Sequence, residues 1–75
     1  MNQQSKWLSV SELKERTSTL KIWLNNNEDH FQKRIVEGEL QNYELLLDRI
    51  TDSGELYAEN NYFTSTYTQI KEKSL

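Results

Sequence analysis

The sequence predicts a mainly helical small domain with one short two-stranded hairpin, and three local patterns lead to this expectation. Residues 9–12 read Ser-Val-Ser-Glu, a capping box that starts a helix. Residues 20–24 place apolar side chains at i, i+3 and i+4, as on one helix face. Residues 33–41 place β-branched side chains before a glycine turn. The alternative is an all-α helical hairpin or bundle.

The first helix follows an apolar lead-in, Trp7-Leu8, and its extent has two interpretations. The run Thr-Ser-Thr at 17–19 favours a break between a helix over 10–16 and a second over 19–26. The rival is one unbroken helix, because a heptad stripe runs through the segment. The stripe consists of Val10, Leu13, Thr17, Leu20 and Leu24. The Asn run at 25–27 ends the helix in either case, since Asn tolerates the left-handed conformation.

Residues 33–41 are equally ambiguous. They form a hairpin with Glu37-Gly38 at its turn, or they continue helically at a cost of about 1 kcal/mol for the glycine. From residue 42 we expect a helix that stops at 52–54, where the sequence reads Asp-Ser-Gly. A short helical continuation over 55–59 and a last helical turn over 69–75, with Ile70 inward, complete the prediction.

Composition excludes several classes of protein. The 75 residues suffice for one small domain, and we expect residues 1–6 to be disordered and 7–75 to form that domain. No apolar stretch approaches the length of a membrane span, and the N-terminus lacks the apolar core of a signal peptide. Without Cys, the chain has no disulfide and no Cys-ligated metal. We expect a cytoplasmic setting.

Small size and sparse chemistry argue against catalysis. The sole histidine is His30, and the sequence contains no glycine-rich phosphate loop. A core this thin leaves little room for a pocket and its scaffold. We therefore expect no enzyme, no cofactor, no bound metal and no small-molecule substrate.

The net charge of −3 is unevenly distributed. Residues 1–34 carry six cations and four acids, a net of +2, whereas residues 35–75 carry three cations and eight acids, a net of −5. The N-terminal half is thus the part suited to a polyanion.

The order of these features resembles the MerR-like winged helices, which include phage and plasmid excisionases. The resemblance is carried by the aromatic lead-in, the capped helix and Thr-Leu-Lys-Ile-Trp-Leu at 19–24. Arg34, Gly38 and Tyr43 match the wing, and Leu-Leu-Asp-Arg-Ile at 46–50 matches the following helix. It implies a winged helix-turn-helix over 7–50, with 51–75 used for packing or dimerisation. The turn between the first two helices is shorter here than in the family.

The first functional hypothesis is a small sequence-specific DNA-binding regulator, of excisionase or repressor type, that inserts its second helix into the major groove of double-stranded DNA. The wing would contact the backbone or the minor groove. The residues assigned to DNA are Ser18, Thr19, Lys21, Asn25, Asn26, Lys33 and Arg34.

The second hypothesis is a small all-α interaction or inhibitor protein of a mobile element that binds a larger protein and has no role on DNA. Under both hypotheses, aromatic residues of the acidic half form a homodimer or partner interface. These residues are Tyr57, Tyr62, Phe63 and Tyr67. The remaining large aromatics are assigned to the core, namely Trp7, Trp23, Phe31 and Tyr43. An unbroken helix over 10–26 favours the second hypothesis, and a break at 17–19 favours the first.

Overall fold

The structure is a computed structural model that describes residues 7–60 and 66–73, with side chains up to residue 71. Its elements are β1 (Trp7–Ser9), α1 (Val10–Asn26), α2 (Lys33–Ser53), β2 (Tyr57–Glu59) and α3 (Thr66–Lys73). The expectation of a mainly helical domain with a short two-stranded sheet is confirmed. The predicted disorder of residues 1–6 falls outside the described residues.

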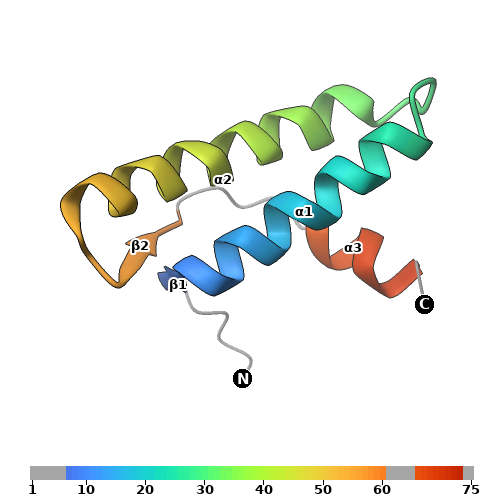
Figure 1. Ribbon diagram of the computed structural model, residues 1–75. Coiled ribbons are helices and arrows are strands. Elements are labelled where there is room, and N and C mark those ends of the chain that lie inside the picture. The colour runs from blue at the N-terminus through green and yellow to red at the C-terminus, as the bar shows by residue number, and fades with distance from the viewer. Residues whose placement is uncertain (1–6, 61–65, 74–75) are drawn as a thin grey trace.

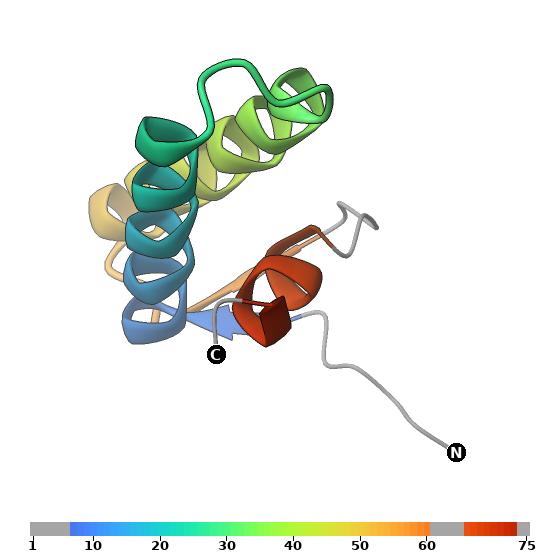
Figure 2. The same ribbon diagram turned by 90° about the vertical axis from the view of Figure 1, so that its right-hand side faces the viewer.

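The two long helices form an antiparallel hairpin, joined by residues 27–32, and separate toward the end where the strands lie (Figure 1). In the second view, α1 and α2 make a wedge, and α3 lies in its open side (Figure 2). Contacts of α3 with both long helices, and of β1 with α1 and β2 with α2, close the wedge into one unit.

The capping box fixes where α1 begins. The amide of Glu12 donates to Ser9 Oγ at 3.1 Å, and the amide of Ser9 donates to Glu12 Oε1 at 2.9 Å. Leu8 before the cap and Leu13 after it are both buried, so the hydrophobic staple is also formed. Because Ser9 is the last residue of β1, the same motif sets the angle between the strand and the helix.

The predicted break at 17–19 is wrong, since α1 continues without interruption to Asn26. Thr17 lies on the buried face with Leu13 and Leu20, as the heptad alternative requires. Its hydroxyl donates to the carbonyl of Lys14 at 2.9 Å, so the polar group is satisfied within the helix. A buried threonine therefore serves as a core position here and does not cap a second helix.

The helix ends at the predicted asparagines, by a different mechanism. Asn27 has a φ of −136°, outside the left-handed region. Its side-chain amide donates to the carbonyl of Trp23 at 2.8 Å, and its backbone N–H donates to that of Leu24 at 3.3 Å. Asparagine thus satisfies carbonyls that the helix end leaves open.

The predicted hairpin over 33–41 is also wrong, because α2 is one helix from Lys33 to Ser53. Glu37-Gly38 lies inside its second turn. The helical spacing decides the outcome because it brings five side chains onto one buried face. They are Val36, Glu39, Tyr43, Leu46 and Ile50. Gly54 then ends the helix with a φ of 76°, a left-handed conformation that favours glycine, and donates to the carbonyl of Ile50 at 2.9 Å.

The two-stranded sheet pairs the two ends of the hairpin and replaces the wing expected at 33–41. β1 and β2 run antiparallel, with Leu8 opposite Ala58 and Trp7 opposite Glu59. The helical continuation expected over 55–59 is wrong, since 57–59 is strand. Leu8 and Ala58 face the core, whereas Trp7 and Tyr57 remain more than half exposed.

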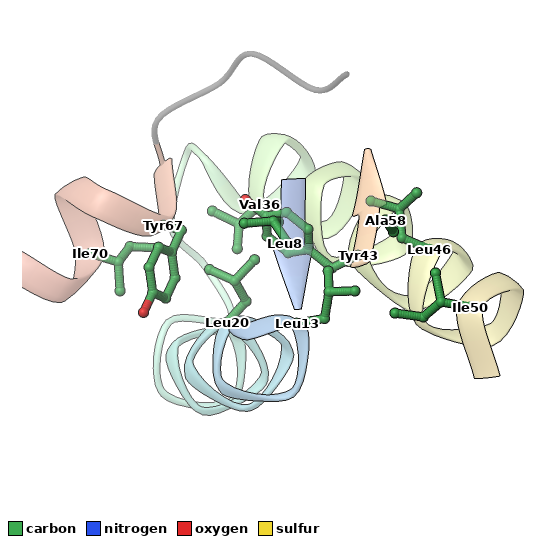
Figure 3. Packing of buried hydrophobic residues seen from close by; sticks show 10 residues of the cluster. All are labelled: Leu8, Leu13, Leu20, Val36, Tyr43, Leu46, Ile50, Ala58, Tyr67 and Ile70. Carbon is green, nitrogen blue, oxygen red and sulfur yellow. The ribbon is translucent and has the colours of Figure 1, made fainter. Parts of the chain in front are cut away.

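The core lies between the helices, and every described element contributes to it (Figure 3). Tyr67 and Ile70 reach it from α3, which confirms the inward position of Ile70. In the described part of the chain, no helix has both the length and the apolar character needed to cross a membrane.

We expect Ser9→Ala to lower the free energy of unfolding by about 1 kcal/mol, because it removes the acceptor for the Glu12 amide. Urea denaturation monitored by circular dichroism measures this difference. Ser11→Ala, an exposed serine two residues later in α1, is the matched control and leaves stability within about 0.5 kcal/mol. Equal effects of the two substitutions would contradict the importance of the cap.

Candidate functional site

An ionisable side chain is buried within the core. Glu39 on α2 has no exposed surface, although carboxylates are almost never fully buried unless they are paired. The hydroxyls of Tyr43, one turn later, and of Thr66, at the start of α3, both donate to its carboxylate. Among the described residues, no buried side-chain nitrogen or oxygen lacks a hydrogen-bond partner. The buried acid is therefore part of a satisfied network.

The network continues to the surface through Arg16 on α1. Its Nη1 donates to the Tyr43 hydroxyl at 2.9 Å, and its guanidinium carbon lies 4.7 Å from the centroid of the Tyr67 ring. The Tyr67 hydroxyl donates to Glu15 Oε2 at 3.0 Å, and Lys71 Nζ donates to the same oxygen at 3.1 Å. These contacts attach α3 to α1, and the bond from Thr66 to Glu39 attaches it to α2.

The pKa values in the network follow from these contacts. Burial, followed by the hydrogen bond to Glu39, raises the pKa of Tyr43. Burial also raises the pKa of Tyr67, and its bond to Glu15 adds to this. Hydrogen bonds from Lys71 and then Tyr67 lower the pKa of Glu15. Both tyrosines thus remain protonated donors, and Glu15 remains a charged acceptor. This arrangement joins helices and offers no activated nucleophile.

The residues assigned to DNA fall into two groups. Five lie on α1 but on different sides of it: Lys21 faces α2, where it meets Glu44, whereas Thr19 and Asn26 line a hollow with Ile70 of α3. The five are Ser18, Thr19, Lys21, Asn25 and Asn26. Lys33 and Arg34 lie at the start of α2, across the connecting loop from the end of α1 (Figure 1). The structure therefore distributes them over an unbroken helical hairpin and does not place them on a separate recognition helix and wing.

Acids neutralise several of the cations that phosphate binding would need. Lys21 Nζ lies 3.3 Å from Glu44 Oε2 on α2, and Lys71 pairs with Glu15. Arg16 stacks within the internal network. Within the described residues, Lys33 and Arg34 make no ion pair, so they are the part of the predicted set that retains uncompensated charge.

The aromatic residues divide differently from the prediction. Of those assigned to the partner interface, Tyr57 is 54% exposed, Tyr67 is buried, and Tyr62 and Phe63 lie outside the described residues. Of those assigned to the core, Tyr43 is buried and Trp23 packs against the core while partly exposed.

The core assignment is wrong for the two remaining aromatics. Phe31 is 88% exposed and stacks on His30, whose other neighbour is Trp23, at the tip of the hairpin. Trp7 is exposed because successive side chains of a strand point to opposite faces. In β1, Leu8 points into the core and Trp7 therefore points outward.

Three exposed apolar residues gather at the strand end of the molecule. Trp7, Leu56 and Tyr57 are 55%, 76% and 54% exposed. Together with Gly54 and Glu55 they line an open hollow of about 670 Å³. We call Trp7, Leu56 and Tyr57 the Trp7 surface. Of these three residues, the sequence predicted an interface role for Tyr57 only and a core position for Trp7. The proximity of residue 7 to residues 56–57 depends on a strand pairing that three-residue strands do not signal.

Within the described residues, no group of three or more His, Cys, Asp or Glu side chains is arranged to hold a metal ion. Comparison of the chain with protein-family models, curated proteins and solved structures found no match. The resemblance to MerR-like winged helices therefore stays a prediction.

We expect Tyr43→Phe to make the free energy of unfolding less dependent on pH in the alkaline range. Because folding raises the pKa of Tyr43 above its ordinary value near 10, its contribution to stability is complete below pH 10 and is lost as the pH rises beyond it. Between pH 10 and 11 the free energy of unfolding should fall by about 1 kcal/mol more in the parent protein than in Tyr43→Phe. Urea denaturation across this range tests the difference.

The exposed Tyr57→Phe variant provides the control, since it should retain the pH dependence of the parent. Parallel curves for the parent and Tyr43→Phe would contradict the assigned effect of burial on Tyr43.

Proposed function

We propose that the chain is a small, non-enzymatic interaction protein that docks onto a larger protein through the Trp7 surface. The single observation that carries this proposal is the exposed cluster of two aromatic rings and a leucine beside an open hollow. Aromatic residues are enriched where proteins bind one another, because rigid rings bury much area at low entropic cost. A cytoplasmic setting is part of the proposal.

The unbroken α1 supports this choice over DNA binding. A helix-turn-helix needs two helices that meet at a turn, so that the second can enter the major groove alone. In α1, Thr17 and Leu20 are buried against the rest of the hairpin, and the segment 19–26 continues the first helix. Insertion into a groove would therefore carry the whole hairpin with it.

Charge supports the same choice. Phosphate contacts supply essentially all of the non-specific affinity for DNA. On α1, Lys14 and Lys21 are balanced by Glu12 and Glu15, and Lys21 is also paired with Glu44. Such a helix supplies little attraction for a polyanion.

The DNA hypothesis is tested by fluorescence anisotropy of a labelled mixed-sequence duplex at about 50 mM salt. We expect a Kd weaker than about 0.1 mM, the weak end of non-specific binding. Tight binding that falls steeply with salt and is lost in Lys33→Ala combined with Arg34→Ala would overturn our proposal and restore the first hypothesis.

Protein docking is tested by selection of a random-peptide display library on the immobilised full chain. Enriched peptides should lose about tenfold or more in affinity for Leu56→Ala, because the substitution removes a side chain that lines the hollow. Leu45→Ala is the matched control, since Leu45 is similarly exposed (65%) but lies on the outer face of α2. It should leave affinity unchanged.

Enrichment that is insensitive to Leu56→Ala, or equally sensitive to Leu45→Ala, would contradict docking at the Trp7 surface. Neither leucine is part of the core, so both variants should fold, and circular dichroism verifies this.

A further inference from the structure

The size of the Trp7 surface suits a peptide segment better than a broad protein face. The exposed parts of its three residues amount to roughly 400 Å², whereas a standard interface buries about 800 Å² on each partner. The hollow, of about 670 Å³, is open to solvent, so an occupant would lie in it with one side exposed. A short segment with an apolar anchor fills such a space.

The residues that line the hollow determine which kind of side chain a bound segment can insert as its anchor. Trp7 and Tyr57 lie on the outward side of the two-stranded sheet, and Leu56 precedes β2. Gly54, which ends α2, contributes a wall without a side chain. Two rings and a leucine present mostly apolar surface, which favours an aliphatic or aromatic side chain as the anchor.

The rim adds a charge requirement. Residues 50–60 contain the acids Asp52, Glu55 and Glu59 and no Lys or Arg, and all three acids are exposed. Glu55 lines the hollow itself, and Glu59 is the strand partner of Trp7. Arg49 is the nearest cation before this segment, and Lys6, next to Trp7 in the sequence, lies outside the described residues. Glu59 has an interaction of its own, so the charge argument depends on Glu55, which lines the hollow, and on Asp52, which is exposed in the same acidic stretch of the chain. An apolar hollow beside such a stretch complements a segment that carries positive charge.

The same charges select among possible occupants. A second copy of this chain would bring one acidic stretch against another, and like charges across an interface are unfavourable. Nucleic acid is disfavoured for the same reason. Both arguments leave a basic segment of a different protein.

We propose that the Trp7 surface binds a short peptide segment of a partner protein in which an apolar side chain is flanked by Lys or Arg. This inference rests on the proposed interaction function and specifies the chemistry of its partner. The apolar side chain enters the hollow, and the flanking cations face Glu55, which lines the hollow, and the acidic stretch of chain that also contains Asp52.

The test uses three fluorescein-labelled twelve-residue peptides and the full chain. The first carries a central Phe flanked by Lys and Arg, the second replaces these cations by Glu, and the third replaces Phe by Ala. We expect the first to bind at least tenfold more tightly than either of the others at low salt. Leu56→Ala should weaken the first peptide about tenfold, and Leu45→Ala should not.

Charge reversal provides the decisive comparison. Asp52→Lys combined with Glu55→Lys should exchange the preference, so that the Glu-flanked peptide binds more tightly than the basic one. Lys-flanked and Glu-flanked peptides of equal affinity for the parent, or a preference that survives the reversal, would overturn the inference about charge. So would binding of the basic peptide that does not change with Leu56→Ala, since it would indicate a general attraction to an acidic protein.

The two proposals fail separately. If displayed peptides depend on Leu56 but carry no excess of Lys or Arg, the docking function stands and the basic partner is wrong. If no selected peptide depends on Leu56, the docking function itself is wrong.

Discussion

The burial of Glu39 in the core depends on hydrogen bonds to its carboxylate, and two of them come from hydroxyl groups of the described residues. An unpaired buried charge would cost more than a small core can offset. One hydroxyl comes from the same helix, through Tyr43, and the other from α3, through Thr66. The position of α3 is thereby tied to the solvation of a charge inside the hairpin. This constraint links the last element of the chain to the middle of α2.

The outer contacts of α3 extend the same principle. Tyr67 contributes a ring to the core, a stacking face to Arg16 and a hydroxyl to Glu15. Lys71 meets Glu15 where water reaches the pair, so its contribution to stability is small. Most of the attachment therefore comes from the buried end of the helix, where Thr66, Tyr67 and Ile70 lie. The chain has few aliphatic side chains, and hydrogen bonds of Thr66 and Tyr67 add to the apolar contacts that hold α3 in place.

The sequence is sufficient to predict the mainly helical class, the start of α1 and its end, since caps are local motifs. It does not decide whether Thr17 breaks a helix or lies within one, because the answer depends on burial against α2. The buried face of α2 is hard to recognise in the sequence, because a search for apolar residues at helical spacing leaves out the charged type of residue at position 39. The pairing of Trp7 with Glu59 cannot be predicted from the sequence either, since it joins distant segments through strands of only three residues. The predicted DNA-binding residues therefore lie on α1 and at the start of α2, whereas the exposed apolar cluster arises from that pairing.

The sheet has a kinetic consequence. Leu8 and Ala58 are about fifty positions apart in the chain, so their pairing closes a loop that contains the whole helical hairpin. Helical turns form from neighbouring residues and are fast, whereas closure of a long loop must await the folding of what it encloses. We therefore expect the hairpin to fold before the strands meet, and the contact surface of Trp7 and Tyr57 to be among the last features of the native state to form. A partner that binds both residues recognises a chain that has finished folding.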